Sequence, residues 1–236
     1  MGNIRMGVPE NIVLLLKDTL HVNSFIETGT FKGHTAAWAA RHFEKVITIE
    51  NSRKFYMEAS SFYKDKRNIQ FIFGNSREYL RDHICEINSP AIFWLDAHWS
   101  GFGTYGENDQ CPLLDELDNI LAGGVNHSIL IDDARLFLSP PPAPNKLEYW
   151  PDIDQIFEKF RTRSTKYYLV VFEDVLNAVP PEAKQAIMHY CQVQNTRSWT
   201  RKMNHRPRRM IARLKINLMN LIQEWASSTG KKENSG

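Results

Sequence analysis

Residues 24–35 read Ser-Phe-Ile-Glu-Thr-Gly-Thr-Phe-Lys-Gly-His-Thr, an apolar segment that runs into a turn containing Gly29 and Gly33. The segment before the turn has the composition of a short buried strand, and the Ala-rich residues after it favour a helix. Backbone N–H groups at such a strand–turn–helix junction face the anionic or carbonyl end of a ligand. Gly29 allows the close approach that a side chain would obstruct.

The same alternation of strand and helix continues along the chain. Further strands are predicted at 45–50, 69–73, 91–96, 128–133 and 167–172. Helices are predicted at 9–21, 34–42, 52–63, from the turn at 74–76 to 84, and at 112–122, 152–161 and 180–192. The pattern predicts an α/β domain over residues 1–196, with a Rossmann-like, doubly wound, mainly parallel sheet and helices on both faces.

Composition excludes several classes of protein. The 236 residues are 42% hydrophobic and 24% charged, which is ordinary for a globular protein. No apolar run approaches the roughly 18 residues of a membrane span. Cys85, Cys111 and Cys191 are too widely spaced for a zinc cluster or a disulfide framework. The N-terminus lacks a signal-peptide cleavage site, so we expect a cytoplasmic protein.

The net charge is only +2, but the charges are unevenly distributed between an acidic N-terminal part and a basic C-terminal arm. Residues 1–182 hold 18 basic and 25 acidic residues, whereas residues 183–223 hold nine basic residues and no acid. The arm, residues 197–236, is predicted to form a basic amphipathic helix with a disordered end. Its bases are Arg197, Arg201, Lys202, Arg206, Arg208, Arg209, Arg213 and Lys215, and its apolar stripe is Ile211, Leu214, Leu218, Leu221 and Trp225.

We expect the stripe of this arm to pack on the domain or on a second copy, which would make the chain a homodimer. Peripheral contact with an anionic membrane is the alternative. Nucleic-acid binding is disfavoured because no aromatic recognition motif accompanies the bases.

Polar residues gather where the predicted strands end. Parallel strands bring their carboxyl ends to one edge of the sheet, and ligands bind outside that edge. Glu50 follows Gly29 by 21 residues, a separation at which an acid commonly binds a ribose diol. The glycine spacing is not that of the dinucleotide-binding motif, which counts against NAD. Two glycines alone indicate only a turn, but Glu27 beside them suits a ligand with an ammonium or sulfonium group.

On these residues the chain resembles the class I S-adenosylmethionine-dependent methyltransferases. The resemblance is closest to the metal-dependent small-molecule branch, which includes catechol O-methyltransferases and the macrocin/novobiocin-type sugar O-methyltransferases. The matching segments are Glu27 to Thr35, Thr48-Ile49-Glu50, Gly74-Asn75-Ser76, Leu95-Asp96 and Ile131-Asp132-Asp133.

The resemblance implies a binding site for S-adenosylmethionine. Glu27 and the Gly29–Gly33 turn would hold its methionine part, Thr35 its carboxylate, and Glu50 its ribose. The adenine edge would meet Asn75 and Ser76. The full set is Glu27, Thr28, Gly29, Thr30, Phe31, Gly33, Thr35, Glu50, Asn51, Gly74, Asn75, Ser76 and Asp96. The family often has a third glycine where this chain has Phe31, so Phe31 is expected to pack on the cofactor.

Three carboxylates, those of Asp96, Asp132 and Asp133, follow two neighbouring predicted strands. Crowded carboxylates repel one another unless a positive group lies between them, and an all-oxygen set suits Mg²⁺ or another hard divalent cation. The resemblance implies a metal at these three positions. The alternative is that Asp132 or Asp133 caps the following helix.

His98 lies two residues after Asp96 and is the candidate general base. A histidine has a suitable pKa for removing a hydroxyl proton near neutral pH. The matching position in related sugar O-methyltransferases carries an Asp, and catechol enzymes use a Lys nearby. His98 as a further metal ligand, or Lys32 or His34 as the base, remain alternatives.

These features predict an O-methyltransferase that uses S-adenosylmethionine, with the assistance of Mg²⁺, to methylate a hydroxyl of a small molecule or sugar. One alternative is a cofactor-binding scaffold that its basic arm recruits to a partner or membrane. Another is a nucleic-acid methyltransferase, which is disfavoured because no N-P-P-Y type motif is present.

Overall fold

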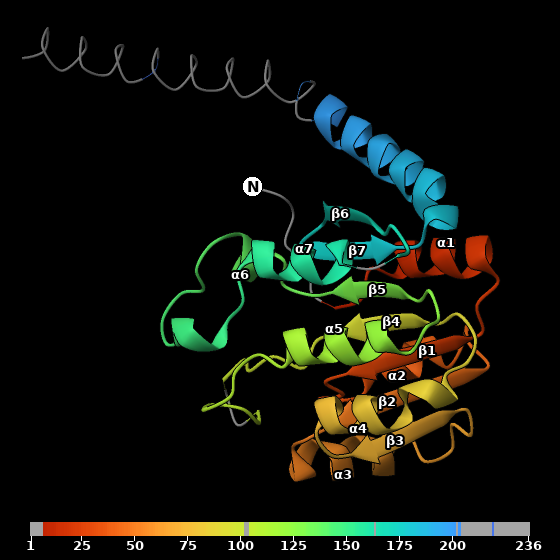
Figure 1. Ribbon diagram of the computed structural model, residues 1–236, viewed down its shortest axis with the longest axis vertical. Coiled ribbons are helices and arrows are strands. Elements are labelled where there is room, and N and C mark those ends of the chain that lie inside the picture. The colour runs from red at the N-terminus through yellow and green to blue at the C-terminus, as the bar shows by residue number, and fades with distance from the viewer. Residues whose placement is uncertain (1–6, 102–103, 163, 202, 204–218, 220–236) are drawn as a thin grey trace, which may run out of the picture. The chain divides into compact units, whose positions relative to one another are not determined.

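The computed structural model describes residues 7–101, 104–162, 164–201, 203 and 219. The chain divides into two compact units, Met1–Ile187 and Met188–Gly236. The first unit contains the sheet and its helices (Figure 1).

In the described part of the first unit, seven strands form one sheet in the order β3-β2-β1-β4-β5-β7-β6. Their bounds are β1 Ser24–Thr28, β2 Lys45–Glu50, β3 Ile69–Phe73, β4 Ile92–Leu95, β5 Ser128–Ile131, β6 Tyr168–Phe172 and β7 Val175–Val179. Strands β1 to β5 pair in parallel, and β7 is antiparallel to both its neighbours. This confirms the predicted Rossmann-like, mainly parallel sheet.

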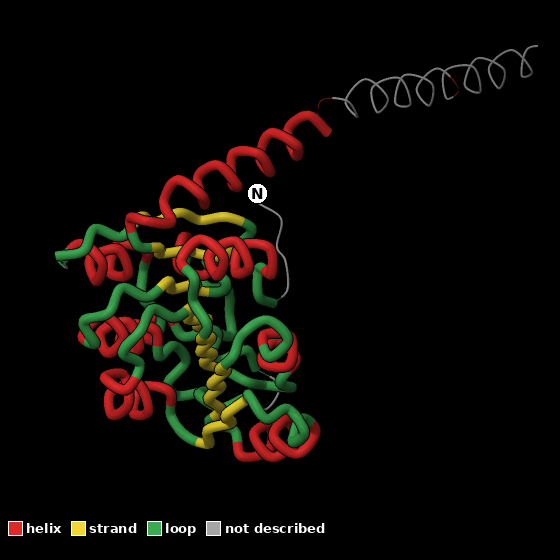
Figure 2. The backbone as a smooth tube through the Cα atoms, turned by 90° about the vertical axis from the view of Figure 1, so that its right-hand side faces the viewer, coloured by secondary structure: helices red, strands yellow, loops and turns green. Residues whose placement is uncertain are grey.

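Helices lie on both sides of this sheet, as the turned view shows (Figure 2). They are α1 Glu10–Leu20, α2 His34–Ala39, α3 Arg53–Phe62, α4 Ser76–His83, α5 Leu113–Ala122, α6 Arg135–Leu138 and α7 Ile153–Arg161. Short 3₁₀ turns occupy Ile84–Glu86, Leu147–Tyr149 and Pro181–Ala183.

The side chains of successive residues in each strand point to opposite faces of the sheet. In β1, Ile26 joins a core that includes Leu80 of α4 and Leu117 of α5. Its neighbour Phe25 packs edge-on against Trp38 of α2, with ring centroids 6.3 Å apart. Because both faces are covered, the central strands are mostly apolar, and ligands reach the sheet from its carboxyl edge.

One strand of the sheet, β7, was not predicted from the sequence. The last predicted strand ended at residue 172, whereas the chain turns back at Glu173 and Asp174 to form β7. The helix predicted from 180 follows it, as a 3₁₀ turn at Pro181–Ala183 and an α-helix from 184. Glu173 and Asp174 both have positive φ, 50° and 69°, as a tight hairpin requires. The hairpin carries no glycine at these positions, so its sequence lacks the usual turn signal.

In the second unit, residues 188–201 and 203 are helical, and Arg197 and Arg201 lie on this helix. The remaining arm bases, Lys202 and those between 206 and 215, and the predicted apolar stripe lie outside the described residues. Among the described helices, none has the length and apolarity needed to cross a membrane.

Candidate functional site

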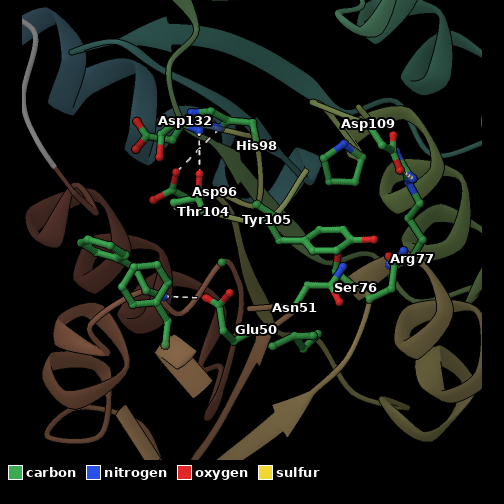
Figure 3. A pocket seen from close by; sticks show the side chains of 18 of the residues that line it. Glu50, Asn51, Ser76, Arg77, Asp96, His98, Thr104, Tyr105, Asp109 and Asp132 are labelled. Carbon is green, nitrogen blue, oxygen red and sulfur yellow. Dashed lines mark hydrogen bonds and ion pairs between the residues drawn. The ribbon is translucent and has the colours of Figure 1, made fainter. Parts of the chain in front are cut away.

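A cleft of about 300 Å³ opens at the carboxyl edge of the sheet, within the size range of small-molecule sites (Figure 3). It is lined by most of the residues that the sequence singled out: Gly29, Phe31, Glu50, Asn51, Gly74, Asn75, Ser76, Asp96, His98, Asp132 and Asp133. The lining does not include Glu27, Thr28, Thr30, Gly33 or Thr35, nor the alternative bases Lys32 and His34.

The glycine turn packs directly on the end of β4. Gly29 has φ of +88°, and a Cβ built at this position would lie 2.3 Å from the backbone oxygen of Asp96. Its N–H donates to Ile49 O at 2.9 Å. No side chain fits at residue 29, so the turn and the end of β4 together form an unobstructed floor for a ligand.

Glu50 is fixed by two backbone groups. Oε2 accepts the Phe31 N–H at 2.8 Å, and Oε1 accepts the Ser52 N–H at 2.7 Å. A carboxylate oxygen has a second lone pair, so each oxygen keeps acceptor capacity for a ligand in the cleft. Phe31 also lines this end, and its half-exposed ring lies 4.6 Å from that of Phe55.

Glu27 lies beneath the turn rather than in the cleft lining. Only 1% of the residue is exposed, and Thr48 Oγ1 donates to its Oε2 at 2.6 Å. The hydroxyl groups of Thr48 and Thr30 are also 2.6 Å apart, so Glu27 is connected to the turn through Thr48. Burial raises the pKa of Glu27 to about 8.

Two residues that line the cleft, Arg77 and Asp109, form an ion pair that was not predicted from the sequence. Arg77, directly after Ser76, binds both carboxylate oxygens of Asp109 and approaches Asp115 with Nε at 3.0 Å. Figure 3 shows Arg77 and Asp109 together at one side of the cleft, with Tyr105 extending across it toward that side. The two halves of the pair are 32 residues apart and carry no joint signal in the sequence.

His98 is held between two acids from adjacent strand ends. Its Nε2 lies 2.9 Å from Asp133 Oδ2, and its Nδ1 lies 3.7 Å from Asp96 Oδ1. The Trp150 ring packs edge-on against the imidazole at 5.5 Å. The imidazole is therefore fixed in orientation, with one nitrogen engaged and the other beyond hydrogen-bond range of its nearest acid.

Burial alone would lower the pKa of His98, but the hydrogen bond to Asp133 and the charge of Asp96 outweigh burial and raise it above its ordinary value. Burial would raise the pKa of Asp133, yet His98 and Arg135 bring it below its ordinary value. Burial and neighbouring carboxylates raise the pKa of Asp132 to about 8, and burial raises that of Asp96 to about 6.

Arg135 completes the cluster. Its Nη1 donates to Asp133 Oδ1 at 2.6 Å and also binds the carboxylate of Asp174. Asp132 Oδ1 accepts the Asp133 N–H at 2.7 Å. The following helix α6 begins after Ala134, and the side chain that accepts its first N–H, that of Arg135, is Asp174. The alternative in which Asp132 or Asp133 caps this helix is therefore wrong.

The arrangement does not fit the predicted Mg²⁺ site. Both oxygens of Asp133 already bind side chains, those of His98 and Arg135, and one oxygen of Asp132 binds a backbone N–H. Among the residues that the structure describes, no three His, Cys, Asp or Glu side chains are arranged to hold a metal ion.

The loop that carries His98 is held by hydrogen bonds within the loop and to residues 146–150. Trp99 N–H donates to Gln110 O at 2.7 Å. The Gln110 side-chain oxygen accepts from Lys146 N at 2.9 Å and from Trp150 Nε1 at 3.0 Å. Gln110 thus fixes Trp150, the ring that packs on His98.

No family model matches this chain, and no curated protein matches it. Solved structures do match its fold. The O-methyltransferase TomG from Streptomyces achromogenes, involved in tomaymycin synthesis and solved with S-adenosylmethionine, has a TM-score of 0.53 at 16% identity, over 75% of this chain and 82% of that chain.

Two further structures agree. A putative O-methyltransferase from Klebsiella pneumoniae gives a TM-score of 0.52 at 16% identity over 74% of this chain and 82% of its own. An O-methyltransferase from Bacillus cereus with S-adenosylhomocysteine gives 0.50 at 16% identity over 73% and 82%. The predicted fold, the Rossmann-like fold of class I S-adenosylmethionine-dependent methyltransferases, is confirmed.

Proposed function

We propose that the protein is an S-adenosylmethionine-dependent O-methyltransferase that methylates a hydroxyl group of a small molecule or sugar. The observation that carries the proposal is a single cleft with two chemically distinct ends. One end has the glycine floor and Glu50, and the other has His98 held by Asp133.

The first end suits S-adenosylmethionine. Gly29 leaves the backbone of the turn open to the ligand, and Glu50 offers carboxylate oxygens to ribose hydroxyls. Asn75 caps α4 by accepting the Arg77 N–H at 3.0 Å, which positions the start of this helix and Ser76 beside the cleft. When bound, S-adenosylmethionine supplies a sulfonium methyl carbon, whose transfer to a hydroxyl oxygen releases one proton.

His98 is placed to take that proton. With its own hydrogen on Nε2, the neutral ring donates to Asp133 and keeps the Nδ1 lone pair free. Nδ1 therefore accepts the proton of the acceptor hydroxyl. The imidazolium that results has Asp133 against Nε2 and Asp96 near Nδ1, and both acids stabilise its charge.

The surroundings keep the imidazole in this position. Trp150 and the loop residue Gln110 restrict the ring from one side. Precise placement of the base relative to the hydroxyl supports the reaction because methyl transfer is an in-line displacement. No step in this scheme requires the Mg²⁺ predicted from the sequence.

Binding of S-adenosylhomocysteine, measured by calorimetry on the full chain, tests the cofactor site. We expect one site with a dissociation constant on the order of micromolar, and absence of binding by both S-adenosylhomocysteine and S-adenosylmethionine would overturn the proposal. An assay of S-adenosylhomocysteine formation across a panel of sugars, phenols and hydroxy acids then tests the acceptor class. Turnover only with amines or nucleic acids would contradict methylation of a small-molecule or sugar hydroxyl. Homodimerisation through the basic arm remains a prediction.

A further inference from the structure

We propose that Arg135 takes the place of a divalent cation in this site, so that the protein works without a metal ion and excludes one. The inference deepens the proposed function and rests on it. It follows from where the carboxylate oxygens of the cluster are directed.

The carboxylate of Asp133 has no oxygen without a partner. Oδ2 binds His98 Nε2 at 2.9 Å, and Oδ1 binds Arg135 Nη1 at 2.6 Å. Asp132 uses Oδ1 for the Asp133 N–H at 2.7 Å. Mg²⁺ demands near-octahedral oxygen ligands at about 2.0–2.1 Å. A metal bound to Asp133 would therefore share its oxygens with His98 and Arg135 and lie beside the guanidinium charge, which opposes it.

Arg135 is held firmly in this position. Asp174 binds its side chain at Nη1 and also accepts its backbone N–H at 2.9 Å. The Asp174 carbonyl accepts the Ala134 N–H at 2.8 Å. Because Asp174 belongs to the turn between β6 and β7, the hairpin fixes the start of α6 and the direction of the arginine.

The charge of Arg135 is permanent. A guanidinium is not deprotonated in proteins, so Arg135 opposes a second cation at every accessible pH. The carboxylates that would attract a metal are instead compensated by Arg135 and by His98 when it is protonated. The cluster therefore has the positive charge that crowded carboxylates need, but it comes from side chains.

Binding of Mn²⁺, followed by electron paramagnetic resonance, tests the inference. The full chain is treated with EDTA, dialysed and saturated with S-adenosylhomocysteine before titration. We expect no stoichiometric Mn²⁺ site with a dissociation constant below about 1 mM in the natural protein. Removal of the guanidinium in Arg135→Ala should free Asp133 Oδ1 and create a site that binds at least about tenfold more tightly.

Two matched variants sharpen the comparison. Arg135→Lys keeps the positive charge and should bind as little Mn²⁺ as the natural protein. Arg161→Ala removes a charge from the surface of α7, where Arg161 approaches only Asp154 at 3.5 Å and Glu158 at 4.0 Å among its described ion pairs, and should also change nothing.

Each result decides the question. A tight Mn²⁺ site in the natural protein would overturn the inference, and so would a folded Arg135→Ala variant that binds no Mn²⁺. If Arg135→Ala does not fold, Asp174→Asn is used in its place, because it weakens the contact that holds the arginine. Mn²⁺ should then bind to the folded Asp174→Asn variant, and absence of Mn²⁺ binding to it would overturn the inference. The affinity for S-adenosylhomocysteine, measured in the same samples, reports on the proposed function separately.

Discussion

His98 Nε2 and Asp133 Oδ2 lie 2.9 Å apart although the residues are 35 positions apart in the sequence. Strands β4 and β5 bring them together. Their last residues, Leu95 and Ile131, are paired in register, and His98 and Asp133 follow these two strand ends. The acid fixes which imidazole nitrogen carries hydrogen in the neutral ring. It also stabilises the charged ring, and this second effect has a measurable consequence.

Asp133→Asn should lower the pKa of His98, because it removes the hydrogen-bonding charge that raises this pKa above its ordinary value. In the natural protein, His98 becomes a base only above its raised pKa, so the reaction rate should rise with pH through that pKa. In the variant the rise should move to lower pH, while the maximal rate falls by about 10²-fold because the ring is no longer held. Histidine NMR titration and the pH profile of S-adenosylhomocysteine formation measure both effects. The exposed change Asp154→Asn is the control, and an unshifted titration in Asp133→Asn would contradict the pairing.

Gly29→Ala should abolish binding of S-adenosylhomocysteine, because its Cβ would lie 2.3 Å from the Asp96 carbonyl oxygen and force the turn away from β4. Gly124→Ala is the matched control. It also has positive φ, +76°, but nothing lies within 4 Å of the added Cβ, so it should cost only the roughly 1–2 kcal/mol of a left-handed alanine. Calorimetry and thermal unfolding of both variants separate the steric effect from backbone strain. Equal losses of affinity would show that the close approach to Asp96 does not matter.

Much of this site could be predicted from the sequence because parallel strands converge at one edge. The motif at 27–33, Glu50 and the acids after 95 and 131 are each fixed relative to a strand end, so local patterns determine their neighbourhood. The cleft lining contains Gly29, Glu50 and Asp132 accordingly.

The contacts that were not predicted depend on loop conformation. The contact of Arg135 with Asp174 depends on a hairpin whose turn has no glycine or asparagine. The pair of Arg77 with Asp109 likewise depends on how the loop after β4 returns to the cleft. Sequence periodicity carries no information on such contacts. The metal site was predicted because the three carboxylates follow strand ends, whereas the hold of Asp174 on Arg135 depends on the hairpin between β6 and β7.

Glu50→Gln should weaken binding of S-adenosylhomocysteine by about 10- to 100-fold, the range expected for hydrogen bonds to a charged group. The amide keeps one oxygen acceptor, but its NH₂ group would face a backbone donor, either the Phe31 N–H or the Ser52 N–H. Loss of affinity with little change in the free energy of unfolding would support a ligand-binding role. Glu58→Gln, on the exposed side of α3, is the matched control. Unchanged affinity in Glu50→Gln would contradict the ribose assignment.

His127 should make the fold sensitive to mild acid. It is fully buried, its Nδ1 accepts the Ala91 N–H at 3.2 Å, and its ring packs on Phe93 at 4.9 Å. Burial lowers its pKa to about 4, whereas in the unfolded chain the pKa is about 6.5. The unfolded state therefore binds a proton first, and the contribution of His127 to stability is complete above pH 6.5 and is lost as pH falls toward 4. The loss amounts to about 3 kcal/mol.

Denaturant unfolding of the natural protein and of His127→Gln between pH 7.5 and about 4 tests this linkage. The difference between their free energies of unfolding should shrink as pH falls, because only the natural protein must keep a buried imidazole neutral. Buried acids such as Glu27 and Glu116, whose pKa values burial raises to about 8 and about 7, act in the opposite direction. They are present in both proteins and cancel in the difference. His42→Gln, on an exposed residue, serves as the control. A difference for His127→Gln that stays constant across the pH range would show that the imidazole is protonated equally in the folded and unfolded chains.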